Sequence, residues 1–284
     1  MYEKVLVTLD GSETSETVLP YVEELARSLG SDLSFISVCP EHERNLDRIW
    51  REHLDDLAGR FKAKGLPARA VFTYGNPVEE ILRYAHEIGA NLIAMSTHGR
   101  SGFVEWTVGG VAEKVLIRAR VPLLLIPGKR ELAGTVKSGK LERILVPLAI
   151  SESGPNALPW AKELARRTGA KLFLFHVIPS THKVVGVLDH AVDFERQLVA
   201  ALRRRADEYM AGIAADLKKD KIDFQSDLAT GVPLDAMLDY VKDHSIDLIA
   251  MSTHGRTGAS RVILGSVTHQ IVHSSAAPVL VVRP

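Results

Sequence analysis

Positions 95–100 of this chain read Met-Ser-Thr-His-Gly-Arg, and positions 251–256 read the same six residues again, 156 positions later. The residues in front of each copy match as well, because Asn91–Ala94 corresponds to Asp247–Ala250 at the same spacing. Colinear matches at one fixed spacing indicate that the chain contains two copies of one domain.

Earlier in the chain the two copies match at a shorter spacing. Leu25–Arg27 recurs as Leu164–Arg166, 139 positions later, so the second copy holds 17 additional residues between its second and third strands. The segment between the copies is rich in Gly, Lys and Ser, a composition typical of a linker. The predicted domains are 1–128 and 141–284, the linker is 129–140, and a longer helical insertion covers about 178–228.

Short apolar runs alternate with segments of helical periodicity along each copy. Val5–Leu9 is typical of a strand covered on both faces, and Val18–Leu29 repeats apolar residues at helical spacing. Gly30 stands where a left-handed helix cap is common, and Asn76 precedes a proline as an N-cap does. The alternation predicts an α/β fold of two tandem doubly wound, mainly parallel five-stranded sheets with helices on both faces. The predicted strands of the first copy are 5–9, 33–38, 70–73, 92–95 and 122–126.

The charge balance and the cysteine count exclude several classes of protein. The 284 residues include 35 Lys and Arg against 35 Asp and Glu, so no general attraction to nucleic acid or to an anionic membrane is expected. Cys39 is the only cysteine, which excludes an intrachain disulfide and a cysteine-rich zinc site. Charged residues interrupt every apolar run, and Met1–Val5 leads directly into a strand. We therefore expect no membrane span, no signal peptide and a cytoplasmic location, with no nucleic-acid partner and no membrane partner.

Ligands of doubly wound sheets bind beyond the carboxyl ends of the strands. In the first copy, Leu9–Ser12, residues 38–39 and Met95–Gly102 end there. The last segment is glycine-rich and leads into a helix, so its backbone N–H groups can surround an anion. Isolated glycines often only form turns, but this pattern recurs after the same strand of both copies. The recurrence favours a phosphate site.

The spacing of these small residues resembles the signature of the universal stress protein family, Gly-x2-Gly-x9-Gly-[Ser/Thr]. The matching residues are Ser96, Gly99, Gly109 and Gly110 in the first copy and Ser252, Gly255, Gly265 and Ser266 in the second. The opening strand with its Asp10 and the closing strands at 121–127 and 277–282 also look like those of the family, so the resemblance covers nearly the whole chain. It implies a Rossmann-like fold of the adenine-nucleotide alpha-hydrolase type. It also implies ATP as the ligand, with or without Mg²⁺, or ADP or AMP in its place.

The resemblance also implies roles for individual residues. Asp10 would accept hydrogen bonds from the adenosine, the backbone of Val38 would meet the adenine, and amides at 109–111 would hold phosphate oxygens. The expected nucleotide-binding residues of the first copy are Thr8, Asp10, Val38, Met95, Ser96, His98, Gly99, Gly109, Gly110 and Val111. Those of the second copy are Pro147, Val177, Met251, Ser252, His254, Gly255, Gly265, Ser266 and Val267.

Each copy departs from the family signature in a different way. Both copies begin it with serine, which has less backbone freedom than glycine. Gly110 in the first copy replaces a Ser or Thr hydroxyl, which removes a hydrogen bond worth roughly 1–2 kcal/mol. The second copy has Ala149-Ile150 where the first has Asp10-Gly11, so it lacks the carboxylate. We expect the first copy to bind nucleotide more firmly, because a backbone cradle tolerates a lost hydroxyl better than adenosine recognition tolerates a lost carboxylate.

The expected function is that of an ATP-binding stress-response protein that regulates other proteins; a slow ATPase and a nucleotide-free scaffold are the alternatives. Fast phosphoryl transfer needs Mg²⁺-holding carboxylates and a cation over the phosphates, and only Arg100 and Arg256 lie near the glycine loops. His98 and His254 have a serine nearby but no triad carboxylate, which favours a ligand-edge or structural role over catalysis. The acidic and histidine residues at 41–43 and 53 match no strict metal-ligand spacing. We therefore predict no catalytic residue and no metal ligand.

The closing strands, Pro122–Ile126 and Pro278–Val282, are apolar and lie at the edges of their predicted sheets. In the universal stress protein family such strands pair across a dimer, so the resemblance implies that they pair with each other inside this chain as an internal pseudo-dimer. A homodimer of two chains is a further option.

Overall fold

The computed structural model describes residues 1–40, 47–98, 110–128, 140–150, 157–179, 191–252 and 265–283, with the backbone alone at 191–196. By contacts the chain divides into two compact units. Unit 1 is Met1–Leu141 together with Ser252–Pro284, and unit 2 is Glu142–Met251.

Unit 1 is built on a sheet with the strand order β3-β2-β1-β4-β5-β10. Its strands are β1 (Lys4–Thr8), β2 (Asp32–Cys39), β3 (Ala68–Tyr74), β4 (Leu92–Ser96), β5 (Leu123–Ile126) and β10 (Val279–Val282). β1 is central and parallel to both neighbours, since Val5 lies opposite Leu33 on β2 and opposite Leu92 on β4. β10 runs antiparallel to β5, with Leu280 opposite Leu124. The predicted pairing of the two closing strands is confirmed.

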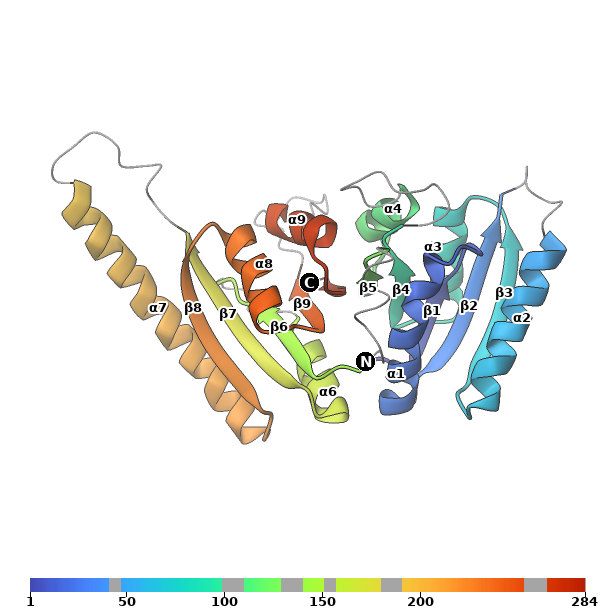
Figure 1. Ribbon diagram of the computed structural model, residues 1–284, viewed down its shortest axis with the longest axis horizontal. Helices are drawn as coiled ribbons and strands as arrows, with labels where there is room; N and C mark the ends of the chain where they lie inside the picture. The colour runs from blue at the N-terminus through green and yellow to red at the C-terminus, as the bar shows by residue number, and fades with distance from the viewer. Residues whose placement is uncertain are drawn as a thin grey trace. The chain divides into compact units, whose positions relative to one another are not determined.

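Helices cover both faces of this sheet. They are η1 (Ser15–Val18), α1 (Leu19–Leu29), α2 (Asp47–Ala63), α3 (Pro77–Glu87), α4 (Gly110–Arg118) and α9 (Ser266–Ser274). Right-handed crossovers place α1 and α2 on one face and α3 and α4 on the other, where α3 packs against α4. In Figure 1, α1 lies in front of the strands and α3 behind them. The predicted doubly wound α/β architecture is confirmed for this unit.

The apolar residues from which the strands of unit 1 were predicted lie in its core. Val5, Leu6 and Val7 have no exposed surface, as expected for a strand covered on both faces. Phe35 on β2 packs edge-to-face on Phe61 of α2, with ring centroids 5.0 Å apart. These contacts hold the sheet and the helix α2 together in the core of unit 1.

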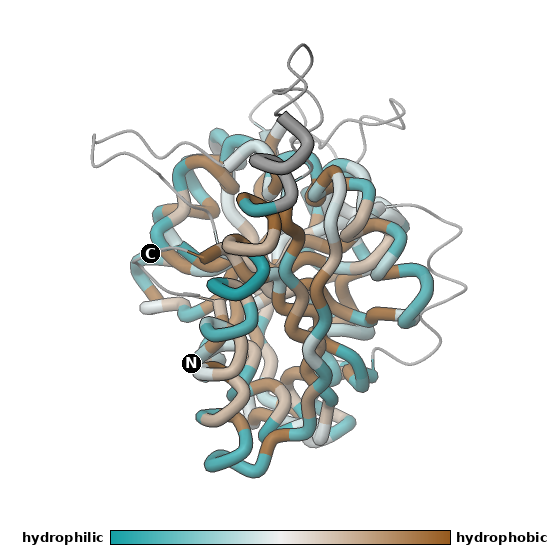
Figure 2. Tube along the Cα trace, turned by 90° about the vertical axis from the view of Figure 1, so that its left-hand side faces the viewer, coloured by the Kyte–Doolittle hydropathy of each residue, from teal (hydrophilic) through white to brown (hydrophobic). Residues whose placement is uncertain are grey.

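Unit 2 contains four parallel strands in the order β9-β6-β7-β8. The elements are β6 (Arg143–Pro147), α6 (Leu158–Thr168), β7 (Lys171–Pro179), α7 (Ala191–Lys219), β8 (Phe224–Gly231), α8 (Pro233–Asp243) and β9 (Leu248–Ser252). α7 has 29 residues against 17 in its counterpart α2, so it is the longer helix predicted for the second copy. It packs on β7 and β8, and Figure 2 shows hydrophilic and hydrophobic segments alternating along it. The arginines at 203–205 on this helix are exposed.

The compact units differ from the predicted domains at the C-terminal end. Ser252–Pro284 belongs to the second copy by sequence but clusters with unit 1. The cause is the antiparallel ladder between β10 and β5, a contact between strands more than 150 positions apart. Among the described residues, none of the helices combines the length and the apolar character needed to cross a membrane.

Candidate functional site

The carboxyl ends of β1 and β4 lie side by side in unit 1, because the two strands pair in parallel. The chain leaves β1 toward β2 on one side and returns from β3 to β4 on the other. β1 and β4 therefore flank the point where the strand order reverses, which is where sheets of this class bind their ligands. Thr8, the last residue of β1, and Met95, the residue before the last of β4, are buried.

The loop after β1 is held in one conformation by its own polar side chains. Asp10 Oδ1 accepts hydrogen bonds from the backbone N–H of Ser12 (3.0 Å) and from the Ser12 hydroxyl (2.6 Å). Gly11 between them has φ 77°, a left-handed value that favours glycine. The Ser15 hydroxyl donates to the Ser12 carbonyl at 2.8 Å and ties the loop to η1. The Asp10 carboxylate is thus positioned before any ligand arrives.

The segment after β4 is fixed against the end of β5. The Thr97 backbone N–H donates to the Ile126 carbonyl at 2.8 Å, and the Gly128 N–H donates to the Thr97 hydroxyl at 3.2 Å. The same hydroxyl shares a hydrogen bond of 2.9 Å with His98 Nδ1, and the His98 N–H donates to the Ser96 hydroxyl at 3.4 Å. Ser96 and Thr97 are both buried. His98 is therefore oriented by its neighbours, and its place at the edge of a ligand site stays a prediction.

Gly128 joins three strand ends, and the sequence analysis gave it no role. A β-carbon added at Gly128 would lie 2.7 Å from His98 Cβ and 2.7 Å from Thr14 Cγ2. Only glycine allows the chain after β5 to approach both the β1 loop and the end of β4 so closely. The only sequence signal was its place directly after Pro127, at the end of the closing strand.

On the predicted phosphate side, the structure describes the beginning of α4 and of α9. Gly110 is the first residue of α4, and Val111 next to it has 38% of its surface exposed. Gly265 caps α9 without a side-chain hydrogen bond, so no cap side chain occupies the N–H groups of Ser266 and Val267. The Thr268 hydroxyl of α9 donates to the Ser252 carbonyl at 3.3 Å. Gly99, Gly109, His254 and Gly255 lie outside the described residues.

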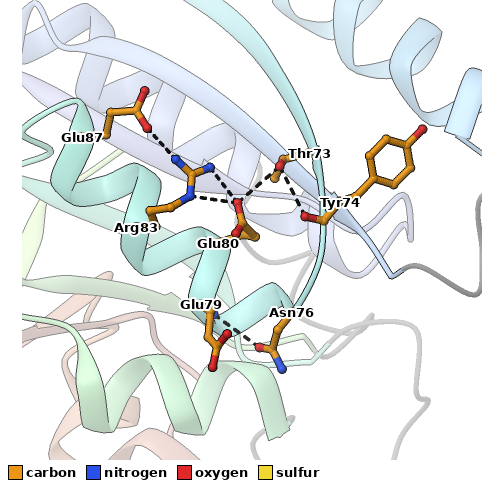
Figure 3. Close-up of polar contacts among 7 residues, drawn as sticks. All are labelled: Thr73, Tyr74, Asn76, Glu79, Glu80, Arg83 and Glu87. Carbon is orange, nitrogen blue, oxygen red and sulfur yellow. Dashed lines mark hydrogen bonds and ion pairs between the residues drawn. The ribbon is translucent and has the colours of Figure 1, made fainter.

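The N-terminus of α3 contrasts with that of α9, because its N–H groups are already bonded. Asn76 Oδ1 accepts from Val78 N at 3.0 Å and from Glu79 N at 3.3 Å, which confirms the predicted N-cap (Figure 3). Glu80, one turn on, accepts from Thr73 Oγ1 at 3.3 Å and from Arg83 Nη2 at 2.7 Å. The hydrogen bond with Arg83 lowers the pKa of Glu80. This network braces the helix against the end of β3 and leaves little capacity there for a ligand.

The adenosine-side residues of the first copy are partly accessible. Val38 on β2 is half-buried and lies opposite Thr73 in the parallel ladder with β3. Cys39 after it is fully buried. The backbone of Val38 therefore ends at the same edge of the sheet as Asp10, although its position relative to a nucleotide stays a prediction.

In unit 2, the corresponding strand end has a different arrangement. The Leu148 carbonyl after β6 shares a hydrogen bond of 2.7 Å with His176 Nδ1 on β7. The first copy has Ser37 at the place of His176, and its buried hydroxyl has no hydrogen-bond partner among the described residues. Pro147 and Val177 are half-buried, and Met251 is buried. Ala149 and Ile150 stand in place of Asp10 and Gly11, so this copy lacks the carboxylate that organises the turn after β1.

The comparisons with known proteins place these features in one family. A family model described as the universal stress protein family matches residues 1–127 and 140–283. Universal stress protein MJ0577 from Methanocaldococcus jannaschii is 28% identical over 153 residues, which cover 50% of this chain and 94% of that protein. Universal stress protein Mb2028c from Mycobacterium bovis is 23% identical over 77% of this chain and 70% of its own length.

Among solved structures, a universal stress protein from Archaeoglobus fulgidus matches with a TM-score of 0.73 and 23% sequence identity. The match covers 100% of this chain and 99% of that one, so the fold is shared over both copies.

Proposed function

Because the chain belongs to the universal stress protein family, whose model matches both copies, we propose that it binds ATP in its first copy. The bound nucleotide controls its association with other proteins in the stress response. The binding residues are those at the ends of β1, β2 and β4 and at the start of α4.

The observation that carries this proposal is the preorganised polar turn at Asp10. Ser12 holds the carboxylate through two hydrogen bonds at 3.0 and 2.6 Å, so the carboxylate does not lose conformational freedom when a ligand binds. A fixed carboxylate at the switch point of the sheet suits the hydroxyl groups of a ribose, which donate hydrogen bonds to it.

The packing around Gly128 supports the same site. Contacts of Gly128 with Thr14 and His98 bring the β1 loop and the end of β4 to one position. A nucleotide that contacts Asp10 with its ribose can then reach the segment after β4 with its phosphates. The start of α4 at Gly110 provides backbone N–H groups that have no partner within the helix, and the positive end of a helix dipole, for these phosphates.

The second copy is the weaker candidate. It has Ala149-Ile150 after β6 instead of the carboxylate and glycine of the first copy. The Leu148 carbonyl beside them is already hydrogen-bonded to His176. We therefore propose one firmly bound nucleotide per chain.

The proposal is tested by the nucleotide content of the purified protein. The untagged chain is denatured and the released nucleotides are identified by mass spectrometry and counted per chain. ATP at about one per chain supports the proposal. ADP or AMP in its place supports a slow ATPase, and no nucleotide together with no ATP binding by calorimetry supports a scaffold and contradicts the proposal.

Calorimetric titration of ATP into three variants locates the site. Asp10→Ala should weaken binding by about 10- to 100-fold, the effect of losing a hydrogen bond to a charged group. Asp10→Asn keeps an oxygen for the Ser12 turn and should be weakened less. Asp32→Ala, an exposed aspartate at the opposite end of β2, is the control and should bind as the parent does.

A further inference from the structure

Two histidines lie one turn apart on α9, and the sequence analysis did not single them out. His269 and His273 are at positions i and i+4, and their ring centroids are 4.2 Å apart with an interplanar angle of 35°. Residues at this spacing point to the same side of a helix. The two imidazoles therefore form a pair on one side of α9.

The pair lies beside the buried side of the helix, not within it. α9 buries Thr268, Ile271 and Val272. His269 is exposed and His273 is half-buried, so an ion from solvent can reach the rings. The nine residues of α9 include no Lys or Arg that would repel a cation from the helix itself.

The geometry suits two-point chelation. Histidine is the commonest protein ligand of transition metals, and zinc–nitrogen bonds are about 2.0–2.1 Å long. Two nitrogens bound to one ion at about a right angle are then about 3 Å apart. The ring centroids are 4.2 Å apart, and rotation about χ1 and χ2 of both side chains is needed to turn one in-plane nitrogen of each ring toward a shared ion.

We propose that His269 and His273 chelate one divalent transition-metal ion of the copper, nickel or zinc type. These ions prefer imidazole nitrogen, whereas Mg²⁺ and Ca²⁺ prefer oxygen ligands. Solvent completes the coordination shell. The chelate cross-links one turn of α9 and stabilises the helix whose first residues, Gly265 and Ser266, belong to the phosphate signature of the second copy. The metal site does not depend on the nucleotide proposed above.

The first copy provides a natural contrast. The positions that correspond to His269 and His273 are Glu113 and Ile117 on α4, 156 residues earlier. Ile117 has 46% of its surface exposed, so this face of α4 is accessible too. Accessibility is therefore common to both helices, and the histidine pair is specific to α9.

Titration with Cu²⁺ is the direct test, because Cu²⁺ binds nitrogen ligands most tightly of the divalent series. The untagged, nucleotide-free chain is titrated and followed by electron paramagnetic resonance, which counts the nitrogens on the ion. We expect one tight site per chain with two imidazole nitrogens. His269→Ala and His273→Gln should each weaken this site by more than the roughly tenfold cost of losing an outer-shell partner.

Controls separate this site from the other histidines, since the chain has 11. His86→Ala removes a single exposed histidine of α3 and should leave the tight site unchanged. Circular dichroism of each variant checks that α9 and the rest of the chain remain folded. A tight site with only one nitrogen, or one that survives both α9 substitutions, would overturn the proposal.

A gain-of-function variant tests whether the pair is sufficient. Glu113→His combined with Ile117→His rebuilds the pair on α4, and this chain should bind two Cu²⁺ ions tightly. If the double variant still binds one ion, two histidines at this spacing do not suffice and the α9 assignment falls with them. The ATP experiments are independent of this result, because they compare variants at Asp10 and leave α9 unchanged.

Discussion

His98 and Gly128 are packed so closely that a β-carbon on Gly128 would lie 2.7 Å from the β-carbon of His98. The same added atom would lie 2.7 Å from the methyl group of Thr14. The junction of the β1 loop with the ends of β4 and β5 therefore requires a residue without a side chain.

Gly128→Ala should lower the free energy of unfolding by about 1–3 kcal/mol, because the methyl group forces His98 or Thr14 to move. The measurement is equilibrium urea unfolding followed by circular dichroism. Gly59→Ala is the matched control, since Gly59 lies inside α2 with nothing within 4 Å of an added β-carbon. That variant should gain up to about 1 kcal/mol from helix propensity. Equal effects of the two substitutions would mean that the junction is not tightly packed.

Much of the fold was predictable, because strands and helices leave local patterns. The left-handed cap at Gly30, with φ 70°, and the N-cap at Asn76 were read from single residues and are confirmed. The fit of Gly128 depends on three segments far apart in the chain, so no local pattern indicates it. The hydrogen bond of His176 to the Leu148 carbonyl is likewise a contact between neighbouring strands that leaves no periodic signal. The clustering of Ser252–Pro284 with unit 1 follows from the β5–β10 ladder, and the pairing of these apolar closing strands was predicted.

Two turns of the second copy should be stabilised by glycine. Lys221 (φ 55°) and Ser245 (φ 48°) are left-handed, and the matching turns of the first copy have Gly65 (φ 76°) and Gly89 (φ 61°). Lys221→Gly and Ser245→Gly should each raise the free energy of unfolding by about 0.5–1 kcal/mol. This value is the energy cost of a left-handed residue other than glycine, minus the additional conformational entropy that glycine loses on folding. Urea unfolding measures both.

The reverse substitutions provide the control for these turns. Gly65→Ala and Gly89→Ala meet no atom within 4 Å, so any loss of stability they cause reflects backbone strain alone. A loss of stability in Lys221→Gly would show that contacts of the lysine side chain outweigh that strain.

Asp247 should make the stability depend on pH. Its Oδ2 accepts the N–H groups of Glu142 at 3.0 Å and Arg143 at 2.8 Å, and burial raises its pKa above the ordinary value. An acid whose pKa is raised in the folded state binds more protons folded than unfolded. Its contribution to stability is therefore present below the unfolded pKa, about 3.9, and is lost as the pH rises through the folded pKa.

Asp247→Asn isolates this effect, because the first copy has Asn91 at the matching place, where it accepts the Lys4 N–H at 2.9 Å. The variant keeps an oxygen acceptor and removes the charge. Urea unfolding should show the variant gaining on the parent as the pH is raised from about 4 to 7. A variant that loses stability relative to the parent over this range would contradict the sign assigned to Asp247.

Gly110→Ser should strengthen ATP binding, if the phosphates lie at the start of α4 as proposed. Gly110 is outside the left-handed region, and an added β-carbon meets no atom within 4 Å, so serine fits without strain. The second copy already has Ser266 at this place. One new hydrogen bond to a phosphate oxygen is worth about 1 kcal/mol, or roughly a fivefold gain in affinity by calorimetry.

Gly110→Ala supplies the same β-carbon without the hydroxyl and should leave the affinity nearly unchanged. An equal gain from alanine would assign the effect to helix propensity, and no gain from serine would place the phosphates away from α4.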